Sequence, residues 1–215
     1  MQTTLPQLLI TGFTPFDGRA VNGSWIAAQT YASANHLEIP VVWGEPLPNL
    51  KQAVESFKPE IVISLGEGRE GWFDIETQAR NQRKHRPDNF AQHPDSDVIP
   101  GGSPSIQSTI NASALHKRLE DQQIPIGISA DAGQFLCEET LYCLEYLKTQ
   151  YDSLRTVVFV HLPPFGTSLI YRGEGRVADA DLLEDFVQRL VIGVLELNDQ
   201  LNLFDTTSHQ TKNRG

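Results

Sequence analysis

The sequence predicts an α/β fold in three layers, with a mostly parallel central sheet and helices on both of its faces. Two observations lead to this fold class. Short apolar runs rich in Val and Ile alternate along the chain with helix-like stretches. The runs are apolar almost throughout, which is typical of parallel strands covered on both faces. We expect one domain over residues 1–204, followed by a polar, disordered tail at residues 205–215.

Five apolar runs and one alternating segment are the predicted strands. The alternating segment, Trp72–Asn81, carries apolar residues on one side and polar residues on the other, like a strand with two different faces. The residues after it, 82–104, are polar and include four prolines, and a connection of this length is usually functional or disordered. The five apolar runs begin at Gln7, Pro40, Glu60, Ile124 and Thr156.

Helices are predicted between these strands. The first two open with Asn22 and Asn49, because Asn is a favoured N-cap residue. The last begins near Asp179 with acidic residues, which a helix N-terminus prefers. The predicted helices cover residues 22–36, 49–57, 105–122, 135–148 and 179–201.

Composition argues against several classes of function. The net charge is −10 and no basic stripe is present, which argues against binding to a nucleic-acid backbone. No run of about eighteen apolar residues could span a membrane, and the N-terminus lacks the features of a signal peptide. Two cysteines do not make a disulfide framework, so we expect a cytoplasmic protein. The expected partner is a small molecule or a peptide.

The two cysteines, Cys137 and Cys143, lie in one predicted helix but in different settings. Cys137 shares an apolar stripe with Leu141 and Leu144, which is typical of a core residue. It also follows Gly133 closely, so it falls near the first helical turn. There, free N–H groups and the helix dipole favour a thiolate and could hold an oxyanion. Both interpretations of Cys137 stay open, whereas Cys143 is predicted to be a core residue.

His161 stands at the carboxyl end of a predicted strand, where α/β sheets place their sites. Its unperturbed pKa of about 6.5 suits a general base, although a half-buried histidine bonded to a carbonyl is equally consistent. A Cys–His pair needs a third group that orients the imidazole. Glu76 could serve, and Asp74, Asp88 and Asp131 are equal candidates.

A glycine-rich segment, Gly66–Gly71, matches the G-x-G-x-x-G pattern of dinucleotide sites. Such a site requires a helix directly after the glycines, but the following residues alternate like a strand. Glu67 and Glu70 would also repel a pyrophosphate. We therefore predict no dinucleotide site, and the scattered histidines predict no metal site.

Several motifs, in order, are shared with one known family. GFTPFDG at Gly12–Gly18 is followed by VNGSW at Val21–Trp25. PDN follows at Pro87–Asn89, AGQFLCE covers Ala132–Glu138, and FVHLP covers Phe159–Pro163. This ordered set resembles the pyroglutamyl-peptidase I family, cysteine peptidases that remove an N-terminal pyroglutamyl residue from peptides.

The resemblance implies roles for particular residues. Cys137 would be the nucleophile, His161 the general base and Glu76 the carboxylate that orients it, with a thioester intermediate and no metal or cofactor. Family members often assemble as tetramers, so a homo-oligomer is expected. The pyroglutamyl pocket would involve Phe13, Phe16, Asn22, Glu67, Phe135 and Leu136.

The chain departs from the family pattern at four places. Glu67 replaces a glutamine, Glu138 an asparagine and Asp17 a glycine. Either Arg86 or His85 could take the role of the family arginine near the oxyanion. These departures indicate a divergent member. The alternative function is a catalytically silent or retargeted protein that binds or hydrolyses another lactam or blocked amide.

Overall fold

Six strands form the central sheet of this computed structural model, which describes residues 6–94 and 97–212 and the side chains of the last helix as far as Asp199. The strand order is β2-β1-β3-β8-β4-β7. All neighbouring strands pair in parallel except β4 and β8, which are antiparallel. The strands are β1 (Leu8–Phe13), β2 (Asn35–Ile39), β3 (Ile61–Glu67), β4 (Phe73–Glu76), β7 (Ile126–Ser129) and β8 (Thr156–Leu162).

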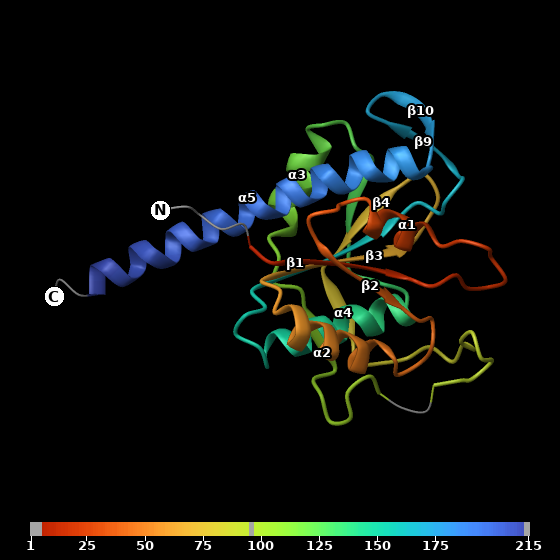
Figure 1. The fold of residues 1–215 in the computed structure, drawn as a ribbon, viewed down its shortest axis with the longest axis horizontal. Helices are drawn as coiled ribbons and strands as arrows, with labels where there is room; N and C mark the ends of the chain where they lie inside the picture. Colours follow the sequence, from red (N-terminus) through yellow and green to blue (C-terminus); the bar gives the residue numbers. More distant parts are fainter. Residues whose placement is uncertain (1–5, 95–96, 213–215) are drawn as a thin grey trace.

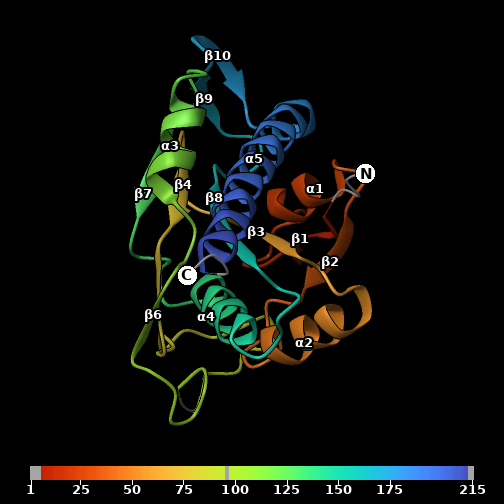
Figure 2. The ribbon, with the colours of Figure 1, turned by 90° about the vertical axis from the view of Figure 1, so that its left-hand side faces the viewer.

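Five helices cover the two faces of this sheet, which confirms the predicted three-layer fold (Figure 1). One face carries α1 (Gly23–Gln29), α3 (Ala112–Glu120) and α5 (Ala180–Lys212), whose apolar residues form one core cluster with the sheet. The other face carries α2 (Pro46–Phe57) and α4 (Leu136–Lys148), which form a second cluster. Figure 2 shows α5 and α4 on opposite sides of β8 and β3.

Two small antiparallel sheets lie outside the central one. β5 (Gln78–Arg80) pairs with β6 (Ser105–Gln107), and β9 (Ser168–Tyr171) pairs with β10 (Glu174–Val177). The predicted strand over Trp72–Asn81 is therefore divided at Thr77 into β4 and β5. Its two faces are as predicted within β4, because Phe73 and Ile75 lie in a core cluster while Asp74 and Glu76 line a cavity.

The predicted strand from Pro40 is wrong, because the second strand lies earlier in the chain. β2 covers Asn35–Ile39, and the prediction had included its first two residues, Asn35 and His36, in the first helix. β2 is an edge strand with a mostly half-buried pattern, so it does not need a continuous apolar run. Pro40 has no N–H to donate to a ladder, and the strand ends before it.

Two predicted helices begin at different residues in the structure. Residues 105–122 contain β6 and then α3, which starts after Asn111, whose side chain accepts a hydrogen bond from the Ala114 N–H. Pairing with β5 overrides the local helical pattern at β6. α2 begins at Pro46 rather than after Asn49, because the fixed φ of proline suits the first helical position.

The last helix is longer than predicted. α5 continues to Lys212, so residues 205–212 of the predicted disordered tail are helical, and residues 213–215 lie outside the described part. Extending an existing helix costs less than nucleating one, so a polar segment can continue it. In Figure 1 the C-terminal half of α5 projects away from the three layers. No helix in the described part of the chain has the length and apolar composition that a bilayer crossing requires.

Candidate active site

A cavity of about 560 Å³ opens where β1, β3 and β7 end and α4 begins. This volume lies within the range of small-molecule and cofactor sites. Three groups of side chains line it. Apolar residues at one end are Phe13, Phe16, Val41, Phe135 and Leu136; Glu76, Cys137 and His161 lie at the middle; Arg69, Asp74, Ile128, Ser129 and Asp131 form the other end.

Cys137 lies in the first turn of α4, as the position after Gly133 predicted. The residue before the helix, Phe135, makes no side-chain cap hydrogen bond, so the first N–H groups of α4 stay available to a ligand. A Cβ added at Gly66 would lie 2.8 Å from Cys137 Sγ and 3.3 Å from His161 Cδ2. The two side chains therefore meet over this glycine.

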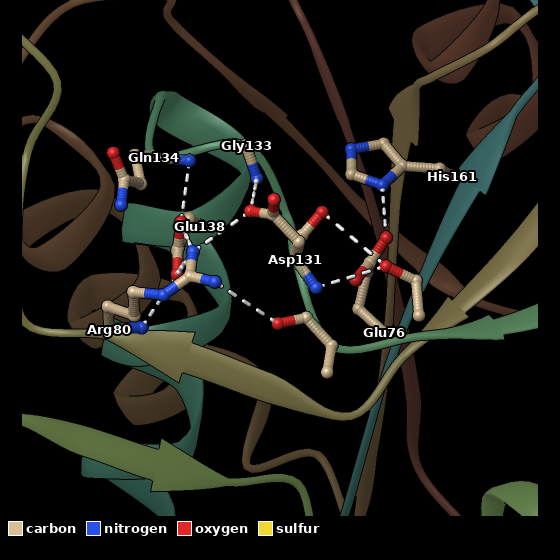
Figure 3. A network of polar contacts seen from close by, with 9 residues as sticks. Glu76, Arg80, Asp131, Gly133, Gln134, Glu138 and His161 are labelled. Atoms are coloured by element: carbon tan, nitrogen blue, oxygen red, sulfur yellow. Dashed lines mark hydrogen bonds and ion pairs between the residues drawn. The ribbon is translucent and has the colours of Figure 1, made fainter.

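His161 is held by a carboxylate on the neighbouring strand. Its Nδ1 lies 2.7 Å from Glu76 Oε1, and both side chains are buried (Figure 3). Burial acts to lower the pKa of His161, but the charge of Cys137, a hydrogen bond with it and the contact with Glu76 raise this pKa from 6.5 to about 10. The raised pKa favours the charged imidazole at neutral pH, and its other nitrogen, Nε2, is not the one bonded to Glu76.

The three other candidate carboxylates have different partners. Asp74 accepts two hydrogen bonds of 2.8 Å from Arg69. Asp131 accepts one from Arg80, at 2.9 Å. Asp88 accepts hydrogen bonds from backbone N–H groups in its own loop and from the backbone N–H of Trp43. Of the four candidates, Glu76 is the one bonded to the imidazole.

The acidic pair after Cys137 does not face the thiol. Glu138 is fully buried and accepts from the Arg80 N–H and guanidinium, as Figure 3 shows, and burial raises its pKa. Glu139 accepts two hydrogen bonds from Arg83, at 2.7 and 2.8 Å. Both carboxylates are therefore compensated by arginines that sequence reasoning did not assign. The alternating pattern of residues 72–81 placed Arg80 on the polar face of its strand, and this was the one sequence signal for its pairing with a carboxylate.

Cys143 lies in the core, as its helical position predicted. Its side chain is fully buried, and burial, followed by the charge of Glu139, raises the pKa of the thiol. Such a thiol is unreactive. Within the residues that the structure describes, no group of three or more His, Cys, Asp or Glu side chains is arranged to hold a metal ion.

Aromatic rings and one guanidinium build the apolar end of the cavity. Phe135 packs edge-on against Trp43 with ring centres 5.0 Å apart. The ring centre of Phe16 lies 6.4 Å from that of Phe135. The Arg86 guanidinium lies 4.2 Å from the centre of the Phe135 ring and forms an ion pair with Asp17. Arg86 thus lines the cavity.

Two further residues predicted from the sequence, His85 and Asn22, differ in their relation to the cavity. His85, the alternative to Arg86, stacks against His93 with ring centres 4.1 Å apart. Asn22 lines the cavity, but its side chain caps α1 through the N–H of Ser24 and donates to the Thr14 carbonyl. It therefore holds the loop between β1 and α1 in place.

Glu67 also lines the cavity, and its carboxylate is neutralised. It forms an ion pair with Arg19 and accepts the N–H groups of Gly23 and Phe165, both at 2.9 Å. The carboxylate at this position is compatible with a neutral ligand because its charge is paired and its acceptors are occupied.

Comparisons with known proteins point to one family. The profile of the pyroglutamyl peptidase family matches residues 6–195. A pyrrolidone-carboxylate peptidase of Klebsiella pneumoniae is 33% identical, over 82% of this chain and 87% of its own. One from Streptomyces coelicolor is 34% identical, over 74% of this chain and 78% of its own.

Solved structures resemble the chain over most of its length. A mutant pyrrolidone carboxyl peptidase from the hyperthermophile Pyrococcus furiosus shares 25% identity and a TM-score of 0.75, covering 88% of this chain and 98% of its own. Pyroglutamyl peptidase I of Bacillus amyloliquefaciens has a TM-score of 0.77 at 23% identity, covering 89% of this chain and 97% of its own. The second likeness bears on the fold alone.

Proposed function

The chain belongs to the pyroglutamyl peptidase family and removes N-terminal pyroglutamate from peptides as a cysteine peptidase, and we propose that Cys137, His161 and Glu76 perform this reaction. The observation that carries the proposal is the arrangement of His161. The imidazole is bonded to Glu76 on one side and meets Cys137 on the other, over Gly66. This is the order nucleophile, base and orienting carboxylate that a thiol peptidase needs.

The proposed reaction begins with Cys137 as thiolate and His161 as imidazolium, a state that the raised pKa of His161 favours. Sγ attacks the pyroglutamyl carbonyl carbon and forms a tetrahedral intermediate. His161 Nε2 then donates its proton to the nitrogen of the leaving peptide, the C–N bond breaks, and a thioester remains. Water, deprotonated by His161, attacks the thioester and releases pyroglutamate. Glu76 keeps Nδ1 protonated and the ring oriented throughout.

The oxyanion is proposed to bind the first N–H groups of α4. These groups lack a side-chain cap, and the positive end of the helix dipole adds to their effect. Arg86 is the second proposed donor, because it lines the cavity whereas His85 stacks on His93. The flat lactam ring would lie among Phe13, Phe16 and Phe135, where it buries apolar area at little entropic cost. Asn22, Glu67 and Leu136 remain predicted contacts of this pocket.

Replacement of the two cysteines tests this proposal. We expect Cys137→Ser to lower kcat/KM for pyroglutamyl 7-amido-4-methylcoumarin by at least about a thousandfold, because catalytic nucleophiles act as a unit with their base. Cys143→Ser is the matched control from the same helix, and it should stay active because its thiol is buried. Iodoacetamide should label the wild-type protein once and fast, at Cys137.

Other outcomes would lead to other conclusions. Full activity in Cys137→Ser would refute the proposed nucleophile. Binding of a pyroglutamyl peptide without turnover by the wild-type protein would favour the silent family member instead. The cytoplasmic location and the homo-oligomeric, tetrameric state implied by the resemblance stay predictions.

A further inference from the structure

The cavity extends beyond the space that one lactam ring requires. β1 lies two strands from β8 on one side, and β7 lies two strands from it on the other. Neighbouring strands are about 4.8 Å apart, so Phe13 and Ser129 each lie about 10 Å across the sheet from His161. If the pyroglutamyl ring binds at the aromatic end, as the proposed function has it, the leaving peptide points toward β4 and β7.

Arg69 is held rigidly at this second end. Its Nε and Nη2 each donate to one carboxylate oxygen of Asp74 at 2.8 Å, and its guanidinium carbon lies 5.2 Å from the centre of the Trp72 ring. Asp74 is the partner of His161 across the β4–β8 pairing. A guanidinium held by a fork and a ring loses little conformational freedom when it binds a further group.

Gly127 on β7 leaves the space that this arrangement needs. A Cβ at Gly127 would lie 2.9 Å from both Asp74 Oδ1 and Trp72 Nε1, and 3.5 Å from Arg69 Nη2. The guanidinium therefore lies over β7, on the side of His161 that faces away from the aromatic pocket.

Arg189 makes the same pair of hydrogen bonds from Nε and Nη2 to a carboxylate, so the two arginines can be compared at their remaining nitrogen, Nη1. Arg189 donates from Nε and Nη2 to Asp185, also at 2.8 Å each, and its Nη1 donates to Gln122 at 2.7 Å. In the described part of the chain, Nη1 of Arg69 has no hydrogen-bond partner. The Arg69 side chain is 62% exposed and lines the cavity. This nitrogen is thus an available donor on a fixed guanidinium, in a residue that lines the cavity on the side proposed for the leaving peptide.

We infer that Arg69 Nη1 donates a hydrogen bond to the main-chain carbonyl of the first residue after the scissile bond. A neutral carbonyl fits this position better than a carboxylate, because Asp74 and Asp131 also line this end of the cavity and Glu76 lines its middle. The inference rests on the proposed function. Recognition of the main chain would add affinity for peptides without selecting their sequence.

Two substrates that differ in this carbonyl test the inference. Pyroglutamyl-alanine amide carries it, and pyroglutamyl isopropylamide lacks it. We expect Arg69→Met to lower the ratio of their kcat/KM values about tenfold relative to the wild-type enzyme, since a hydrogen bond from a charged donor to a carbonyl is lost. The different intrinsic reactivities of the two leaving amines cancel, because both enzymes act on the same pair.

Two further variants complete the experiment. Arg189→Met removes an equal fork on α5 and should leave the ratio unchanged. Arg69→Met with Asp74→Asn leaves no unpaired carboxylate, which protects against misfolding, and should lower the ratio as Arg69→Met does. Equal losses on both substrates in the Arg69 variants would overturn the inference alone. A wild-type protein that cleaves neither substrate would overturn the proposed function and this inference together.

Discussion

Opposing effects act on the charge of His161. Burial disfavours the imidazolium, yet Cys137 and Glu76 favour it enough to raise its pKa from 6.5 to about 10. The raised pKa therefore favours the charged ring in the folded protein at neutral pH. Because the same contacts that raise this pKa also contribute to folding, stability and pH are linked at this residue.

The pH dependence of stability should report this linkage. A histidine with a raised pKa contributes stability that is fully present below its unfolded pKa of about 6.5 and is lost as pH rises through about 10. We expect the gap in free energy of unfolding between the wild-type protein and Glu76→Gln to shrink from pH 6.5 to pH 10. Urea unfolding at several pH values measures it, and a constant gap over this range would contradict the assignment.

At the scale of the element, the start of α4 combines two incompatible requirements. A site for an anion needs free N–H groups, while the helix also carries two acids in its first turn. Each acid is turned away from Cys137 and paired with an arginine from the segment after β4. The first turn of α4 therefore carries two carboxylates, and the two arginines balance their charge.

Removal of one arginine should show how much this pairing matters. Glu139 is 1% exposed and Arg83 is largely buried, so Arg83→Ala leaves a buried carboxylate without its charged partner and with only the Gly44 N–H as a donor. We expect a loss of about 3–5 kcal/mol in the free energy of unfolding. The double variant Arg83→Leu, Glu139→Leu should recover most of it, and the exposed pair on α3, tested by Lys117→Ala, should change stability by less than about 0.5 kcal/mol.

A small effect of Arg83→Ala, no larger than that of Lys117→Ala, would contradict this account. Guanidinium chloride is unsuitable for the measurement because it screens ion pairs, so urea unfolding is the appropriate method.

Elements with a clear pattern of apolar residues were predictable from the sequence. Elements that form only by pairing with segments distant in the sequence were not. The apolar runs of β1, β3 and β8 and the helix α4 were found where expected. β2 and β6 were missed because edge pairing, rather than local pattern, makes them strands. In the site, ordered motifs pointed to Cys137 and His161. The neutralisation of Glu138 and Glu139 was not predictable, because their arginines lie 58 and 56 residues away in sequence.

At the scale of the whole molecule, two hydrophobic cores lie on opposite faces of the sheet and support different parts of it. The cluster under α2 and α4 supports the aromatic end of the cavity. The cluster under α1, α3 and α5 packs against the opposite face of the strands. Phe186 of α5 stacks on Phe73 at the start of β4, with ring centres 3.9 Å apart. Through this contact the last helix helps to position the strand that carries Glu76.

Truncation of this contact should weaken the whole fold. Phe186 is fully buried, so Phe186→Ala removes a large apolar contact and leaves a cavity. We expect a loss of about 3–5 kcal/mol in the free energy of unfolding, measured by urea denaturation. Ile192→Ala on the same helix is the control, because Ile192 is 51% exposed and its loss should cost within about 0.5 kcal/mol. Equal effects of the two variants would argue against α5 as a support of β4.

The missing cap of α4 also has a consequence for protein engineering. Asn22 and Asn111 cap α1 and α3 with their side chains, whereas Phe135 does not cap α4. A search for thermostabilising substitutions would therefore choose Phe135→Asp, since such a cap commonly adds about 1 kcal/mol. The added carboxylate would occupy the N–H groups proposed to bind the oxyanion, and the substitution would remove an aromatic ring from the proposed lactam pocket. Here a gain in thermal tolerance and a loss of turnover would come from one substitution.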